Sequence, residues 1–204
     1  MERSANSKMD INEYLKKKEE QLNRVINNPL LNNNYNQMVA FKMGADFQKT
    51  YNETFLWNQA LFLSSNSAKI LAFDNSNQIA LKAMRLAAQI YEMLYYVSLK
   101  FDKGYCLLLS ALCYDIAGYQ ANASCLIREI YALEECNLLY RYENLFLETV
   151  QLFMQKKLTT INIKVNEVTN ILQREENLDI DYKDAFYFFF YCFLVRKMGR
   201  DYFT

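Results

Sequence analysis

The spacing of apolar residues between positions 79 and 97 constrains the fold more than any other feature of this chain. They recur at intervals of three or four: Ile79, Ala83, Leu86, Ile90, Leu94 and Val97. This spacing places side chains on one face of an α-helix, and no segment alternates with the two-residue period of a half-buried strand. We predict an all-α fold of antiparallel helical hairpins, arranged as an irregular bundle or a degenerate tetratricopeptide-like array.

Weaker periodicity and polar breaks suggest the remaining elements. Pro29 should end a first helix, because proline disfavours helical geometry in the preceding residue. The Asn-rich stretch after that helix reads as a loop. Besides the helix at 79–97, we expect helices at about 10–27, 35–63, 104–117, 120–136, 139–153, 161–172 and 184–198. We expect a loop at 27–37, breaks between helices at 64–67 and 74–77, and a turn at 101–104.

The length and apolar content fit one folded domain. The chain has 204 residues, 52% of them hydrophobic, which is enough for a core and too apolar for wholesale disorder. We expect a single α-helical domain over 1–204. Within it, residues 1–34 would hold the first helix and the Asn-rich loop, and 35–204 the helical array.

The chain has no histidine, four glycines and one proline. The lack of histidine excludes Ser-His-Asp and Cys-His nucleophiles and HExxH zinc sites. No GxxxxGK[ST] or GxGxxG motif is present to cradle phosphates. We expect no catalytic residues, no cofactor and no bound metal, and no ATP hydrolysis; a small enzyme using Tyr, Lys or carboxylates is the least favoured function.

Other candidate chemistry is also weak. The five cysteines form no CxxC pair, and we expect core packing for them: Cys106, Cys113, Cys125, Cys136 and Cys192. The adjacent acids Glu134-Glu135 and Glu175-Glu176, and the nearby Asp179 and Asp181, are not spaced to converge as a catalytic pair.

Net charge and hydropathy bear on partners and location. Lys plus Arg equals Asp plus Glu, 23 each, whereas a general nucleic-acid wrapper needs excess positive charge. The charged amino terminus lacks the apolar region of a secretory signal. Charges interrupt every apolar run before the roughly 20 residues needed to span a bilayer. We expect a cytoplasmic protein without a membrane partner.

A helix pair around Gly118 is more specific than amphipathicity alone. Its spacing resembles the tetratricopeptide helix-turn-helix, in which small residues lie where two helices cross. Gly118 would allow the turn, and the expected seam consists of Ala111, Tyr114, Gly118, Ala123, Ile127 and Ile130. Leu107 replaces the expected large aromatic residue, and no second copy follows at the usual interval of about 34 residues.

The stretch 80–128, above all LLLSALCYDIAGYQANASCLIRE, resembles an N-terminal helical, tetratricopeptide-like region of bacterial DEAD/DEAH-box-like helicases. Some of these helicases belong to antiphage defence systems of the Hachiman type. The resemblance covers about a quarter of the chain, and the helicase motifs themselves are absent. It implies an accessory module, with no catalytic residue carried over.

We therefore predict a non-catalytic helical scaffold that binds another protein or another part of a larger assembly. The alternative is the accessory module of a helicase-like antiphage defence ATPase, contacting nucleic acid or a partner subunit. A basic groove would favour the alternative, and its candidate contacts are Lys82, Arg85, Lys103 and Arg128. The lysines at 16–18 with Arg24 read as a solvated face, and the aromatic run 186–191 as core or an oligomer interface.

Overall fold

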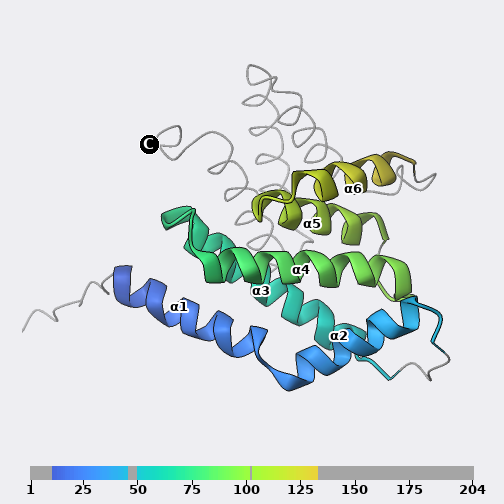
Figure 1. Ribbon diagram of the computed structural model, residues 1–204, viewed down its shortest axis with the longest axis horizontal. Helices are drawn as coiled ribbons and strands as arrows, with labels where there is room; N and C mark the ends of the chain where they lie inside the picture. Colours follow the sequence, from blue (N-terminus) through green and yellow to red (C-terminus); the bar gives the residue numbers. More distant parts are fainter. Residues whose placement is uncertain (1–10, 46–49, 102, 133–204) are drawn as a thin grey trace, which may run out of the picture.

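The computed structural model describes residues 11–45, 50–101 and 103–132, and every regular element among them is an α-helix (Figure 1). The all-α prediction is confirmed. The six helices are α1 (Ile11–Ile26), α2 (Pro29–Lys42), α3 (Glu53–Phe73), α4 (Gln78–Val97), α5 (Lys103–Ile116) and α6 (Gln120–Ala132).

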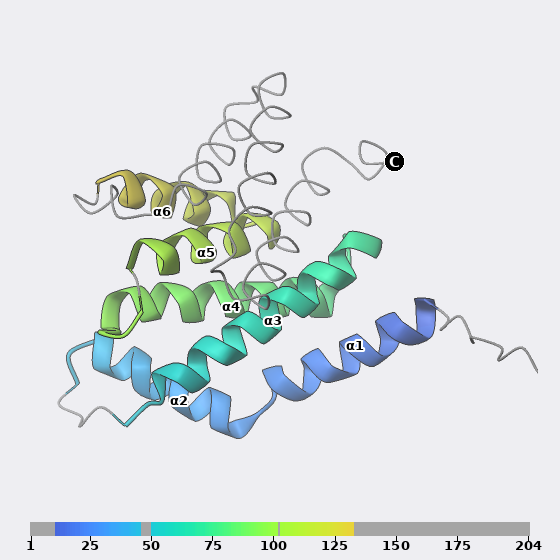
Figure 2. The same cartoon turned by 180° about the vertical axis from the view of Figure 1, so that it is seen from behind.

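Helix α4 lies at the centre of the described part. It packs against α3 and α5, and α5 packs in turn against α6. Short connections make the consecutive pairs from α3 to α6 antiparallel, and α4, α5 and α6 form one layer in Figures 1 and 2. Helices α1 and α2 follow one another along the opposite side of α4. Helix α5 is covered all round, and each of its residues from Cys106 to Ile116 is buried.

Helix α1 matches the prediction for 10–27. Its buried residues, Leu22 and Ile26, are four apart and lie on one face. Glu13 lies in the first turn and Arg24 in the last, where each charge is favourable to the helix dipole.

The predicted loop at 27–37 is wrong, because helix α2 begins at Pro29. The side chain of Asn28 accepts a hydrogen bond from the Leu30 amide at 2.9 Å, which satisfies a free donor of the first turn. Proline fits the first helical position because it has no amide hydrogen to leave unpaired. The expected boundary after residue 34 therefore falls inside a helix.

The buried face of α2 explains why its sequence misleads. Leu31, Asn34 and Met38 are buried, so one of the three inward positions is an asparagine. Asn34 donates to the Leu30 carbonyl at 2.9 Å and accepts from the Asn52 amide at 2.7 Å. A polar residue thus occupies a core position that the apolar pattern does not reveal.

The predicted helix at 35–63 and the break at 64–67 are also wrong. The first is divided between α2 and α3, and α3 continues through the serines to Phe73. Ser64 and Ser67 are buried, and the Ser64 hydroxyl donates to the Ala60 carbonyl at 2.7 Å within the same helix. Serine favours turns when its hydroxyl competes for backbone groups, but here the bond closes inside a packed helix.

The helix predictions for the second half of the described part agree with the structure, whereas the turn predicted at 101–104 is displaced, because α5 already begins at Lys103. The break at 74–77 separates α3 from α4, and Asn77 caps α4 by accepting from the Ala80 amide at 3.0 Å. Helices α4, α5 and α6 begin within a residue of their predicted positions. None of the described helices is both long and apolar enough to cross a membrane.

Some predictions fall outside the described residues. They are the helices at 139–153, 161–172 and 184–198, the acidic pairs from Glu134 onward, the aromatic run 186–191, and Cys136 and Cys192.

Candidate functional site

The turn between α5 and α6 has the backbone that the sequence suggested. Gly118 has a φ of +90°, and a Cβ added there would meet nothing within 4 Å. Glycine is therefore favoured at this position by the left-handed backbone and not by a lack of space. The other five residues of the expected seam are all buried: Ala111, Tyr114, Ala123, Ile127 and Ile130.

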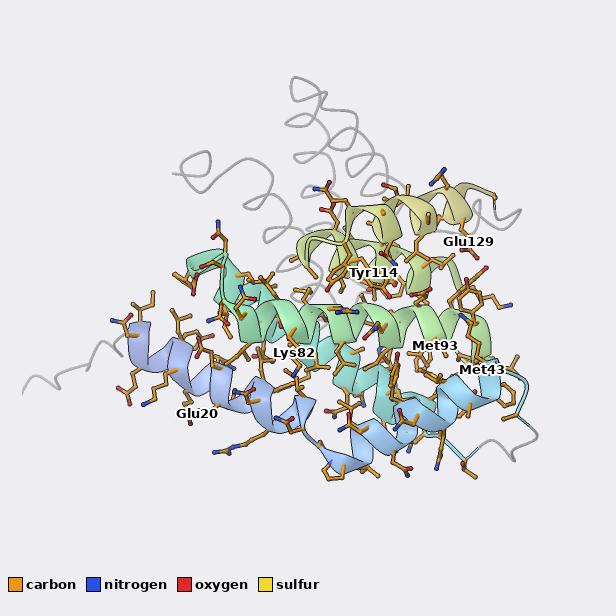
Figure 3. The ribbon with its side chains drawn as sticks, viewed as in Figure 1. Glu20, Met43, Lys82, Met93, Tyr114 and Glu129 are labelled. Carbon is orange, nitrogen blue, oxygen red and sulfur yellow. The ribbon has the colours of Figure 1, made fainter. Side chains whose placement is uncertain are left out.

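The four candidate nucleic-acid contacts are exposed and lie on three helices, α4, α5 and α6. Lys82 lies near the start of α4 (labelled in Figure 3), and Lys103 begins the antiparallel α5, next to the other end of α4. The Arg85 guanidinium lies 4.7 Å from the centre of the Tyr119 ring. Arg128 donates through Nε to the Ser124 carbonyl of its own helix at 3.3 Å. The cations are thus spread over the described surface.

A site that the sequence analysis missed lies beside α4. The Tyr114 hydroxyl on α5 donates to Glu92 Oε2 on α4 at 2.7 Å. Burial raises the pKa of Tyr114 well above its ordinary value, and the bond to Glu92 raises it further because it holds the phenol proton. Tyr114 therefore stays a neutral donor at physiological pH.

A cavity of about 270 Å³ adjoins this hydrogen bond. Six residues line it: Glu92, Tyr114, Ala121, Asn122, Cys125 and Leu126. We call it the Glu92 cavity. Helix α4 supplies the carboxylate, α5 the phenol and α6 the remaining four residues. Figure 3 shows Tyr114 in the region where α5 lies between α4 and α6.

Four more tyrosines lie near Glu92 or Tyr114 without lining the cavity, and we call Tyr35, Tyr95, Tyr96 and Tyr119 the tyrosine rim. The Tyr119 ring contacts Tyr114 edge to face, with centroids 6.2 Å apart. The pKa of Tyr35 on α2 is raised, first by burial and then by the Glu92 carboxylate, while Arg85 lowers it. Glu92, Arg85 and Tyr35 thus interact electrostatically across α2 and α4.

The rest of the rim is at the carboxyl-terminal end of α4. Burial and a hydrogen bond with Glu129 raise the pKa of Tyr95 to about 12. Tyr96 is 45% exposed, and the Lys42 ammonium lies 3.5 Å from the centre of its ring. Cation–π contacts of this kind hold exposed side chains in place. The rim is therefore a partly exposed group of tyrosines, three of which contact a neighbouring ring or cation.

The described residues offer no metal centre, because no group of three or more His, Cys, Asp or Glu is found among them. Cys106 and Cys113 are buried, as expected, whereas the core prediction is wrong for Cys125, which is exposed. Cys125 lies on the outward face of α6 at the Glu92 cavity.

The sequence carried one usable signal for this site. Glu92 is a half-buried acid in a helix whose buried positions are all apolar or tyrosine, and Tyr114 was already expected at the seam. Their pairing could not be seen because they lie 22 positions apart on different helices.

No protein-family model, curated protein or solved structure matches this chain.

Proposed function

We propose that this chain is a non-catalytic helical scaffold that binds another protein, or another part of a larger assembly, through the Glu92 cavity and the tyrosine rim. The observation that carries the proposal is the group of tyrosines, with Arg85, that lies beside the Glu92 cavity. Tyrosine and arginine are enriched among the residues that dominate binding energy at protein interfaces. Tyrosine supplies a large contact area with few rotatable bonds, so little entropy is lost on binding.

The arrangement of hairpins supports the same proposal. The pairs α3–α4 and α5–α6 stack through the contact between α4 and α5, as neighbouring units do in degenerate repeat arrays. Such arrays bind partners on surfaces formed by successive helices, and the Glu92 cavity takes its lining from α4, α5 and α6.

The alternative, an accessory module contacting nucleic acid, has no observation among the described residues in its favour. A nucleic-acid groove needs clustered cations that neutralise phosphates. Lys82 and Lys103 are at opposite ends of the α4–α5 pair, and Arg85 is stacked on Tyr119.

A matched pair of substitutions tests the proposal. Asn122 is exposed and lines the Glu92 cavity, and Asn58 is exposed on α3 and does not line it. The tagged full chain and its Asn122→Arg and Asn58→Arg variants are purified from the source organism under native conditions. We expect a stoichiometric partner with the wild type and with Asn58→Arg, and its loss with Asn122→Arg. Retention of every partner by Asn122→Arg would contradict the proposal.

The same preparations separate the alternative. Fluorescence anisotropy with labelled single-stranded and duplex DNA should show no salt-dependent binding. Binding that weakens with salt and is lost in the Arg85→Ala/Arg128→Ala variant would favour the nucleic-acid module instead.

A further inference from the structure

The Glu92 carboxylate has capacity for a further partner. It is half-buried and accepts one hydrogen bond, from Tyr114 to Oε2. A carboxylate offers about four acceptor positions, and no described residue bonds to Oε1 or places a cation within ion-pairing distance of it. Arg85, two turns earlier on α4, has its guanidinium over the Tyr119 ring. A carboxylate removed from water is costly unless it is paired, so a cationic ligand would gain from this position.

The size and lining of the Glu92 cavity suit one long side chain. Its volume of about 270 Å³ is just below the range of roughly 300–1,000 Å³ that is typical of sites for drug-sized molecules. Tyr114 and Leu126 are buried, whereas Ala121, Asn122 and Cys125 are exposed. The exposed residues form the mouth, and the buried ones form an inner wall with half-buried Glu92. An apolar wall beside a carboxylate matches a side chain with an apolar stem and a charged end.

The charged groups near the cavity also favour a cationic ligand. Glu129 on α6 raises the pKa of both Tyr95 and Tyr96, so a second carboxylate lies on this side of α4. The nearby cations make other contacts: Arg85 lies over the Tyr119 ring, Lys42 over the Tyr96 ring, and Arg128 donates to the Ser124 carbonyl and to Cys125 Sγ. None of them forms an ion pair with Glu92.

We propose that the Glu92 cavity receives an arginine side chain from a peptide segment of the partner protein. The inference rests on the proposed function and names the chemistry of its partner. A guanidinium can pair with the carboxylate through two hydrogen bonds while its plane stacks on a tyrosine ring, which an ammonium cannot do. Tyr114 supplies the ring, and its hydrogen bond holds Glu92 toward the cavity.

The test uses a phage-displayed library of random peptides selected on the full wild-type chain. Selected peptides are synthesised with each arginine replaced in turn by citrulline, which keeps the shape and removes the charge. Their dissociation constants are measured by fluorescence anisotropy for the wild type, Glu92→Gln, Asn122→Arg and Asn58→Arg. The rate of Cys125 alkylation, read by mass spectrometry of its tryptic peptide, reports whether the peptide covers the cavity.

We expect one arginine to dominate. Its replacement by citrulline should weaken binding to the wild type about tenfold or more, as charge-assisted hydrogen bonds do. The same replacement should matter less than about threefold in Glu92→Gln, because a thermodynamic cycle removes the coupling when one partner is neutral. Bound peptide should slow the alkylation of Cys125, and Asn58→Arg should bind as the wild type does.

Three other results have distinct meanings. Peptides that lack arginine, bind Glu92→Gln as well as the wild type and fail to bind Asn122→Arg would overturn the arginine proposal and leave the binding function in place. Peptides in which lysine replaces arginine without loss of affinity would overturn the preference for guanidinium. A selection without any peptide sensitive to Asn122→Arg would overturn both the inference and the proposed function.

Discussion

Ala123 has no exposed surface in the layer formed by α5 and α6. Ala123→Leu would force three more carbons into this position, and overpacking of this kind costs about 1–3 kcal/mol. We expect the melting midpoint to fall by roughly 2–4 °C for each kcal/mol in a protein of this size. Thermal unfolding followed by circular dichroism measures the change.

The control for Ala123→Leu is the neighbouring residue. Asn122 is exposed on the same helix, so Asn122→Ala should change the free energy of unfolding by less than about 0.5 kcal/mol. Equal melting midpoints for the two variants would show that α6 accommodates a leucine at position 123 and that the α5–α6 contact is not close-packed there.

Ser67 offers a prediction of the opposite sign. Its hydroxyl is buried in α3 without a hydrogen-bond partner, and an unsatisfied buried polar group costs about 1–3 kcal/mol. Ser67→Ala removes that group, and alanine also has a higher helix propensity. We expect a gain of about 1 kcal/mol in the free energy of unfolding, measured by urea denaturation.

Ser64 is the matched comparison for Ser67, because it is buried on the same helix but donates to the Ala60 carbonyl at 2.7 Å. Ser64→Ala loses this bond and should gain less stability than Ser67→Ala, or lose some. A larger gain at position 64 than at 67 would contradict the role assigned to the two hydroxyls.

At the scale of the element, the start of α2 depends on one side chain. Asn28 accepts from the Leu30 amide, and replacing such a cap by alanine costs about 0.5–2 kcal/mol. We expect Asn28→Ala to lower the free energy of unfolding by about 1 kcal/mol, and Asn28→Asp to preserve it because aspartate accepts the same bond. Urea denaturation measures both.

Asn32 is the control for Asn28, because it is an asparagine of the same helix that does not cap it. It is exposed in α2, and Asn32→Ala should be neutral or stabilise the protein by a few tenths of a kcal/mol through helix propensity. If Asn28→Ala and Asn32→Ala have the same effect, the cap does not determine where α2 begins.

Elements were predictable where the apolar pattern is continuous. The spacing from Ile79 to Val97 gave α4 correctly, and the polar stretch at 74–77 gave its start. The pattern failed where polar residues point inward, at Asn34 in α2 and at Ser64 in α3. Their side chains bond to backbone groups that become available only once the helices are formed and packed, so residue type alone suggests a loop.

At the scale of the whole molecule, many tyrosines have a raised pKa in the folded state: Tyr35, Tyr51, Tyr91, Tyr95, Tyr96 and Tyr114. A raised pKa means that the folded state holds the phenol proton more tightly than the unfolded state does. The stability from these groups is therefore complete below the ordinary pKa of about 10. It is lost as the pH rises from there through about 12, the folded-state pKa of Tyr95.

We expect a plateau of stability followed by alkaline unfolding. The chain has no histidine, the side chain that ordinarily changes charge between about pH 5 and 8, so the melting midpoint should be constant there. It should fall steeply between about pH 10 and 12. The single tryptophan, Trp57, stacks on Phe101 at 4.5 Å, and its fluorescence follows the transition. A midpoint that is unchanged at pH 12, or one that falls near neutrality, would contradict this prediction.

The sequence by itself determined the all-α fold, the positions of α1 and α4 to α6, and the lack of histidine chemistry. The helices follow from the spacing of apolar residues, which is a local pattern in the sequence. The lack of histidine chemistry follows directly from the composition. Tertiary structure decided the rest. It brought Glu92 against Tyr114, placed Tyr35 and Tyr119 near them, and buried Asn34 and Ser64. Most buried polar side chains need a hydrogen-bond partner. Ser64 finds one within its own helix, whereas Asn34 and Tyr114 find theirs on distant parts of the chain, which meet only once the helices pack together.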